Sequence, residues 1–283
     1  MKINHILPQE SKFTEVLSAI ALKPKMLYFY GKIPENVASV AIVGARKCTA
    51  YGAEIAYKAA YELARRGVVV VSGMALGIDG EAHRGALAAG GVTVAVLGTA
   101  IDKIYPVRHQ GLFKQIIERG AVISEYAPGT KMYAARFLER NRLIAGLADA
   151  VLVVEANERS GSLNTATHAL EQGKDMFAVP GDITRPLSRG CNRLLQQGAY
   201  PYTGVEDILQ VSFPTLVQVE KANLTGDNED ETAILTAVAG GLRDGEQIAT
   251  ALKWEPAKFN QVITMLEIKG RVRGLGMNQW ALI

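Results

Sequence analysis

The sequence is poor in cysteine and contains no long apolar segment. Its 283 residues include only Cys48 and Cys191. These lie far apart and match no zinc-ligand spacing, so we expect packing residues in a reducing compartment and no metal site. No run approaches the roughly 18 apolar residues of a membrane-spanning helix, and the first residues lack the apolar core of a secretion signal. These absences predict a cytoplasmic protein without membrane insertion.

Positive and negative charges are nearly balanced over the chain. The formal net charge is +3, so any role with nucleic acid has to come from local clusters of lysine and arginine rather than from a generally basic surface. Residues 225–283 contain six basic and eight acidic side chains, a net charge of −2. The remaining residues therefore carry +5, and an anion-binding surface is expected among them.

What the sequence does contain is a regular alternation of apolar runs and amphipathic stretches from Ser39 onward. Runs such as "SVAIVG", "VVVVSG" and "VTVAVLG" are continuously apolar, which is typical of strands in a parallel sheet covered on both faces. Many of the helical stretches between them end in glycine, which readily adopts the left-handed conformation of a helix cap. The pattern predicts an α/β fold with a doubly wound, mostly parallel sheet.

Composition changes suggest a boundary on each side of this domain. Residues 1–38 form a short N-terminal extension in which "MLYFYGKIPEN" predicts a strand and turn against the main sheet. The acidic, polar segment "TGDNEDE" marks the end of the main domain, residues 39–224. In residues 225–283, three helical patterns followed by a hairpin indicate a small winged-helix domain. Its basic residues nearest the hairpin, which could contact a phosphate backbone, are Lys269, Arg271 and Arg273.

The turn after the first apolar run has the features of an anion site. Gly44 allows a sharp exit from the strand, and Arg46 adds positive charge beside a helix N-terminus, where backbone N–H groups attract anions. The turn "GARKCT" lacks the second and third glycines of the dinucleotide motif GxGxxG, so no cofactor is expected. An ordinary turn with solvated basic residues remains the alternative.

Two later turns lie in equivalent places, because both follow apolar strands and open α/β sheets bind ligands at the carboxyl edge. Their small residues let a phosphodiester approach closely, and their hydroxyl or carboxylate groups can either cap the next helix or bind a ligand. The candidates are Ser72, Gly73, Gly77 and Asp79 in the first of these turns and Ser160, Gly161 and Ser162 in the second.

The segment "RFLERNR" combines arginines with one aromatic residue just before a helix expected at residues 140–147. Phe137 could stack on an unpaired base while neighbouring arginines contact phosphates. Alternatively, Phe137 belongs to the core, and Arg140 and Arg142 are internal struts, since cations at a helix start oppose the helix dipole. The acidic partners available for such struts are Glu125, Asp149 and Glu155.

Residues 26–210 resemble the DNA-processing protein A family, also called DprA or Smf. The resemblance rests on seven motifs in fixed order: "VGAR", "SGMALGIDGEAHRGAL", "LGTAIDKIYP", "SEYAPG", "FLERNRLIAGLADAVLVVEA", "RSGSLNTATHALEQGKDMFAVPG" and "GCNRLLQQGA". It implies an extended Rossmann-like domain that binds single-stranded DNA without enzymatic turnover and protects it. It also implies help in loading a RecA-type recombinase during natural transformation, and a homodimer formed through the Rossmann-like domain.

The candidate DNA-binding set also includes Arg108, after the motif "LGTAIDKIYP", and Asn141 of "RNR". The chain departs from the usual family pattern at Ala100, Leu138, Glu139 and Asn164. These departures concern the detail of the site.

Two other functions compete with this reading. The loop "SGMALGID" also resembles nucleotide-processing hydrolases of the lysine decarboxylase-like Rossmann group, with Glu125 and Glu155 as a possible carboxylate pair. Their signature PGGxGTxxE is missing, and Thr167 or His168 stands where its glutamate is expected. A regulator acting through the winged helix alone would leave the three open turns unexplained. We therefore expect a binding protein and not an enzyme.

Overall fold

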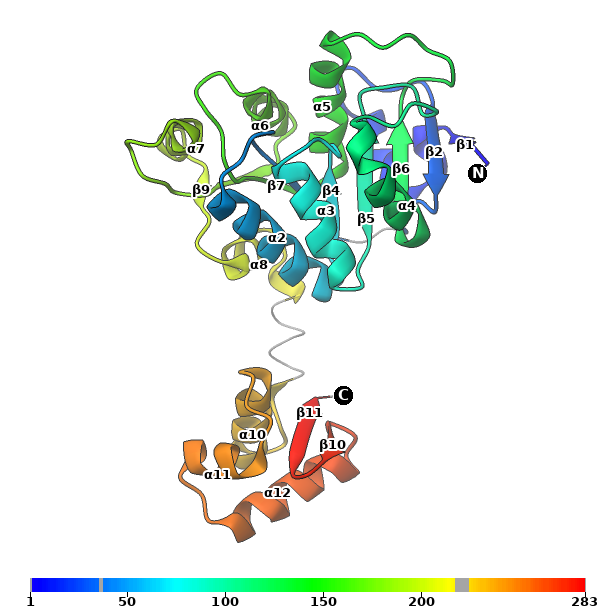
Figure 1. Cartoon of the computed structure of the whole chain (residues 1–283). Helices are drawn as coiled ribbons and strands as arrows, with labels where there is room; N and C mark the ends of the chain where they lie inside the picture. The colour runs from blue at the N-terminus through cyan, green and yellow to red at the C-terminus, as the bar shows by residue number, and fades with distance from the viewer. Residues whose placement is uncertain (1, 36–37, 217–223, 283) are drawn as a thin grey trace. The chain divides into compact units, whose positions relative to one another are not determined.

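The computed structural model describes residues 2–35, 38–216 and 224–282. The chain forms two compact units, Met1–Phe213 and Pro214–Ile283, and each is described by itself. The first is an α/β unit and the second a winged helix, which confirms the predicted fold class (Figure 1). Within the described residues, no helix is long and apolar enough to cross a membrane.

A nine-stranded sheet forms the centre of the first unit, in the order β1-β2-β6-β5-β4-β3-β7-β8-β9. Strands β3 to β9 are parallel, whereas β1 pairs with β2, and β2 with β6, in antiparallel fashion. The bounds are β1 Asn4–Ile6, β2 Leu27–Gly31, β3 Ser39–Val43, β4 Val69–Ser72, β5 Thr93–Leu97, β6 Ala121–Ser124, β7 Ala150–Val153, β8 Asp175–Ala178 and β9 Tyr200–Pro201.

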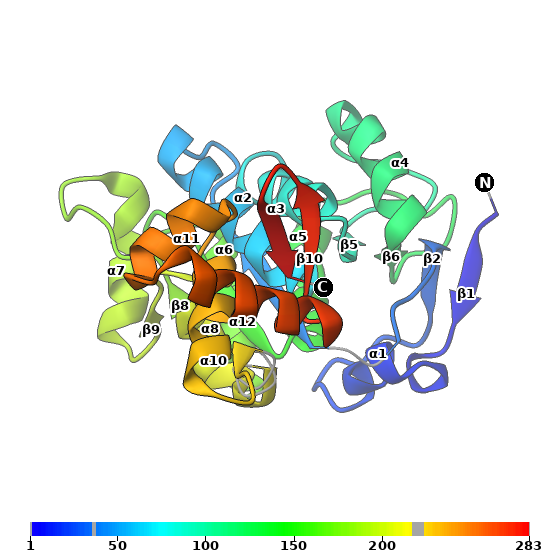
Figure 2. The same ribbon diagram turned by 90° about the horizontal axis from the view of Figure 1, so that it is seen from below.

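The N-terminal residues extend this sheet. The strand expected in "MLYFYGKIPEN" is confirmed as β2, and β1 adds a further strand outside it, at the end of the sheet seen in Figure 2. The short helix α1 (Lys12–Glu15) follows β1, and its Phe13 and the nearby Leu17 pack into the same core as Leu143 and Leu147. The extension is therefore part of the α/β unit's core.

Helices cover both faces of the sheet. Every residue of strands such as β3 and β5 is therefore buried. Alternate strand residues point to opposite faces. Val94 and Val96 pack in the core beneath α5 and α6, whereas Ala95 and Leu97 pack in the core beneath α4. The bounds are α2 Ala50–Arg65, α3 Ile78–Ala88, α4 Gln110–Arg119, α5 Ala135–Leu147, α6 Gly161–Glu171, α7 Pro186–Gln196 and α8 Val205–Ser212.

The strand order creates a crevice at the carboxyl edge of the sheet. From β3 the chain continues through β4, β5 and β6 on one side, and then crosses to β7, β8 and β9 on the other. Connections that leave two adjacent parallel strands in opposite directions open a crevice between them, and β3 and β7 are that pair. The turns after β3, β4 and β7 therefore meet at one edge, as the sequence predicted.

The second unit has its own apolar core. In residues 224–282, α10 (Glu229–Ala239), α11 (Gly245–Leu252) and α12 (Pro256–Ile268) pack together beside a hairpin of β10 (Val272–Gly276) and β11 (Gln279–Leu282). Lys269 lies at the end of α12 rather than on the hairpin, and it is held by the carboxylates of Asp227 and Glu231, each at 2.6 Å. The charge of Lys269 is thus balanced by acidic side chains of the same domain, which weakens its case as a phosphate contact.

Candidate functional site

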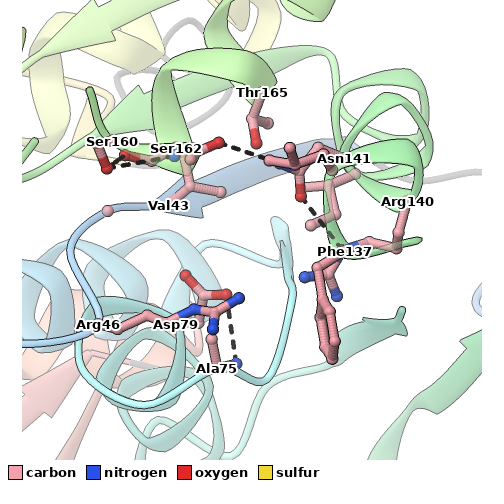
Figure 3. Close-up of a pocket in the computed structure, with 14 residues that line it drawn as sticks. Val43, Arg46, Ala75, Asp79, Phe137, Arg140, Asn141, Ser160, Ser162 and Thr165 are labelled. Carbon is pink, nitrogen blue, oxygen red and sulfur yellow. Dashed lines mark hydrogen bonds between the residues drawn. The ribbon is translucent and has the colours of Figure 1, made fainter. Parts of the chain in front are cut away.

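A cavity of about 260 Å³ opens at the carboxyl edge of the sheet, at the crevice between the adjacent strands β3 and β7. Its walls come from the turns after β3, β4 and β7 and from the first half of α5 (Figure 3). Most of the candidate residues lie here, which brings together segments distant in sequence. Those that line the cavity are Gly44, Arg46, Asp79, Phe137, Arg140, Asn141, Ser160, Gly161 and Ser162.

Arg46 is the exposed cation of the cavity. It follows β3 and precedes the N-terminus of α2, whose first turn is capped by Thr49. In the part of the chain that the structure describes, Arg46 makes no ion pair; its guanidinium carbon lies 5.3 Å from the centre of the Phe137 ring. Its charge is therefore available to a ligand that enters the cavity.

The N-terminus of α6 forms the opposite wall. Ser160 caps the helix, since its hydroxyl accepts from the Ser162 N–H at 3.3 Å, so the predicted cap is present. Asn141 of α5 donates to the Gly161 carbonyl at 3.1 Å and to the Asn164 side chain at 3.2 Å, which fixes the two helices to each other. The first N–H groups of a helix lack intrahelical acceptors and carry partial positive charge, so this wall suits an anion.

Phe137 lies in the first turn of α5, which begins at Ala135 and not at Arg140 as expected. Its ring is half-buried and has Tyr105 at 5.3 Å between ring centres. It also packs on the backbone after β5, because a Cβ placed on Gly98 would come within 2.9 Å of the Phe137 Cδ1. The ring is thus both packed against the protein and part of the cavity wall.

Arg140 is a buried cation that contacts the protein's own backbone. Its side chain is 4% exposed, and its Nη1 donates to the carbonyls of Gly73, at 2.9 Å, and Val96. Burial lowers its pKa to about 10, against the attraction of Asp79. Arg140 therefore stays charged at neutral pH and acts as an internal strut through the backbone carbonyls; none of the expected acidic residues pairs with it, and Asp79 acts on it electrostatically without a direct ion pair among the described residues.

Asp79 is the buried acidic group whose charge acts most strongly on Arg140. Burial raises the pKa of its carboxyl, while Arg140, the Ala75 N–H and Arg46 oppose that rise. It sits in the first turn of α3, where the helix dipole also favours a negative charge. The predicted capping role is wrong: α3 begins at Ile78 with Gly77 as its N-cap and no side-chain cap bond, and the Asp79 carboxylate instead accepts from the Ala75 N–H at 3.4 Å.

Arg142 does not line the cavity. Its Nη2 donates to both carboxylate oxygens of Glu125 at 2.6 Å. This is the internal pairing given above as the alternative to DNA binding. Because Arg142 is paired with Glu125, its charge does not serve a ligand in the cavity. The other candidates outside the cavity are Ser72, Gly73, Gly77 and Arg108.

Ser72 and the two glycines serve contacts within the protein. The buried Ser72 hydroxyl donates to the Ile42 carbonyl at 2.6 Å. Gly77 has φ +76°, and a Cβ there would lie 2.3 Å from the Ala45 carbonyl oxygen; a Cβ on Gly73 would lie 2.5 Å from Arg140 Nη2. The small residues of the second turn therefore let the turns pack closely on one another. Arg108 is exposed, in the turn Val107–His109.

The carboxylate pair proposed for a hydrolase is not formed. Glu125 follows β6 and Glu155 follows β7, with β5, β4 and β3 between them. Four strand spacings separate them, about 19 Å at the usual spacing in a sheet. Glu155 instead accepts from the backbone N–H and hydroxyl of Thr49, at 2.9 and 2.6 Å.

Neither His83 nor His168 completes a catalytic arrangement among the described residues. His83 is fully buried and bonded to Thr93, and burial lowers its pKa to about 3. His168 pairs with Glu171 on α6. The described residues contain no cluster of metal-ligating side chains.

The sequence interpretation missed several residues of the cavity. Ile144 lies one helical turn beyond Arg140, and Thr165 lies one turn beyond Gly161, so both could have been found from the 3.6-residue helix period. Leu138 was noted only as a family departure. The others that line the cavity are Val43 and Ala75.

A family model described as DNA recombination-mediator protein A matches residues 4–212. The chain belongs to this family. A second model, the DprA winged helix domain, matches residues 218–276, so the DprA/Smf resemblance of both parts is confirmed.

Curated relatives support the same family. The putative DNA processing protein DprA of Mycobacterium tuberculosis is 41% identical over 244 residues, which is 82% of this chain and 61% of the relative. DprA of Streptococcus pneumoniae is 43% identical over 194 residues, 68% of each protein. The chain thus spans less than two thirds of the mycobacterial relative.

Solved structures of family members share the fold. The crystal structure of DprA from Streptococcus pneumoniae superposes with a TM-score of 0.69 and 38% identity, covering 75% of each chain. DNA processing protein A from Helicobacter pylori superposes with a TM-score of 0.67 and 30% identity, covering 77% of this chain and 97% of that one. The Helicobacter protein has a single-stranded DNA binding mode described as unique.

Proposed function

We propose that the chain binds single-stranded DNA at the cavity between the turns after β3, β4 and β7. The observation that carries this is the combination of the exposed Arg46, which forms no ion pair with any described residue, the N-terminus of α6 and the Phe137 ring around one opening. The first two suit a phosphate, and the third suits a base. A nucleotide supplies both groups.

The recessed ring favours single strands over duplex. A base can stack on a side chain only when it is unstacked from its neighbours, and every base has a face that can stack. Phe137 is half-buried in the wall of the cavity, where a base within a duplex would not reach it. Binding is therefore expected to be selective for strand state and tolerant of sequence.

We further propose that the bound strand is protected and passed to a RecA-type recombinase during natural transformation, in the cytoplasm, by a homodimer of the Rossmann-like domain. The family's description as a recombination mediator supports a recombinase partner. The protein binds and releases DNA without chemistry on it, because Glu125 and Glu155 are each engaged elsewhere and His83 is buried and neutral.

Replacing Arg46 with alanine should weaken binding to single strands of every sequence. Each phosphate contact to a single strand contributes about 0.7 to the slope of log affinity against log salt concentration, so the slope should flatten by ~0.7. Titration at several salt concentrations measures both effects. Arg65→Ala is the matched control, since Arg65 is also exposed and lies over an aromatic ring, 5.9 Å from the centre of Tyr61, but at the other end of α2. A folded Arg46 variant with unchanged affinity and slope rules this residue out as a contact.

Deleting residues 225–283 should leave a folded protein that still binds single strands. The proposed division into an extension (1–38), a DNA-binding domain (39–224) and a winged-helix domain (225–283) places the cavity wholly in the middle part. The two compact units also have separate apolar cores. Circular dichroism and the same titration test this. If the truncated protein is folded and does not bind, the winged helix is the main DNA site.

A further inference from the structure

Tyr105 presents an exposed aromatic ring immediately beside the cavity. It follows β5, does not line the cavity, and is 42% exposed. Its ring centre lies 5.3 Å from that of Phe137, with 55° between the ring planes. Because of that angle, one flat base cannot lie against both rings. Any base on Tyr105 would therefore be a different base from the one at Phe137.

The loop that carries Tyr105 is held in place on several sides. The Thr99 hydroxyl donates to the Lys103 carbonyl at 2.6 Å, and the Ile101 N–H donates to the Tyr126 carbonyl at 3.1 Å. Beyond the tyrosine, His109 Nδ1 donates to the Met74 carbonyl at 2.9 Å. A ring held on an ordered loop loses little conformational entropy when a base stacks on it.

The neighbouring aromatic rings each have an arginine side chain beside one face, whereas Tyr105 has none among the described residues. The guanidinium of Arg46 lies over Phe137, and that of Arg136 lies 4.3 Å from the ring centre of Tyr126 and 5.0 Å from that of Tyr133. Among the described side chains, none places a cation over Tyr105, and Phe137 is its one ring neighbour. Tyr105 therefore offers an exposed ring beside the cavity with no arginine or lysine over it among the described residues.

We propose that Tyr105 is a second stacking platform, which holds the base next to the one at Phe137 as the strand leaves the cavity. This inference rests on the proposed single-strand binding. It extends the binding site from one nucleotide to two successive nucleotides of the strand. Arg108 fits the same path, since it is exposed and only three residues beyond Tyr105, although it lies outside the cavity. Its exposed charge suits a contact to the following phosphate.

The test measures binding of single strands in which one base at a time is removed to leave an abasic site. Wild-type protein should be sensitive at two adjacent positions, one for each ring. Tyr105→Ala should lower affinity for the intact strand roughly 5- to 150-fold. An abasic site at one of the two positions should then no longer weaken binding further. The slope of log affinity against log salt concentration should stay unchanged, because no phosphate contact is lost. Tyr105→Phe should keep both positions. Tyr57→Ala is the control, because Tyr57 is exposed and also beside another ring, that of Tyr61, but lies along α2.

The outcomes separate this inference from the function on which it rests. If wild-type protein does not bind single strands, the proposed function fails. If wild-type protein binds and Arg46→Ala weakens it, while Tyr105→Ala matches wild type in affinity and in both abasic positions, the second platform alone is refuted. Crosslinking of Tyr105 to 5-iodouracil at only one of the two adjacent positions would support it directly.

Discussion

Replacing Arg140 with methionine is expected to lower the free energy of unfolding by about 3–5 kcal/mol, the range seen when a buried charge loses the opposite charge that stabilises it. Methionine keeps most of the apolar volume but leaves the buried Asp79 carboxylate without its nearest cation. It also removes the donor that reaches the carbonyls of Gly73 and Val96. Denaturant titration measures the loss, and an equally stable variant would show that the strut is dispensable.

The loss should depend on pH in a defined direction. Burial raises the folded-state pKa of Asp79 above its ordinary value, and Arg140 opposes that rise. Without Arg140 the folded-state pKa rises further. A carboxyl that binds its proton more tightly when folded destabilises the protein increasingly as pH rises above the unfolded-state pKa. The deficit relative to wild type should therefore be constant at low pH, where the carboxyl is protonated in both folded proteins, and should grow once the pH passes the raised folded-state pKa of Asp79 in wild type.

A second substitution distinguishes the charge from the packing. Asp79→Asn in the Arg140→Met background removes the uncompensated carboxylate, so it should recover part of the lost stability and flatten the pH dependence. Asp79→Asn alone leaves Arg140 buried without its anion and should itself be destabilising. No recovery in the double variant would mean that Arg140 acts through its hydrogen bonds to the backbone alone.

The sequence predicts the sheet well because buried parallel strands and glycine-terminated helices leave a local pattern. It predicts the cavity's place for the same reason, since turns after parallel strands share one edge. It could not separate Arg46 from Arg142, because an arginine looks the same whether it faces a crevice or pairs with a glutamate. Only the fold brings Glu125 to Arg142 and leaves Arg46 exposed.

The start of α5 could not be predicted from the sequence either. The residue before the helix is Ala134, which offers no capping side chain, so no local signal marks the boundary. Packing of Phe137 on the turn at Gly98 helps to set the start instead. The burial of Arg140 near Asp79 is likewise tertiary, since the two residues come from different helices.

The Phe137 side chain should contribute a large share of single-strand affinity. Replacing Phe137 with alanine is expected to cost about 1–3 kcal/mol in binding free energy, because stacking on one base is lost. The salt slope should stay nearly unchanged, since no phosphate contact is removed, and the preference over duplex should narrow. Phe137→Tyr should retain most of the binding, because the ring remains.

Phe137 also packs on the protein, so binding has to be separated from stability. The ring touches Tyr105 and the turn at Gly98, and its loss is expected to lower the melting temperature as well. Phe29 of β2 is a suitable control, because it is a partly buried phenylalanine that packs against the core and does not line the cavity. Phe29→Ala should lower stability and leave the affinity of the folded protein intact. If Phe137→Ala behaves in the same way, with normal binding by the folded fraction, the ring belongs to the core and stacking at this position is excluded.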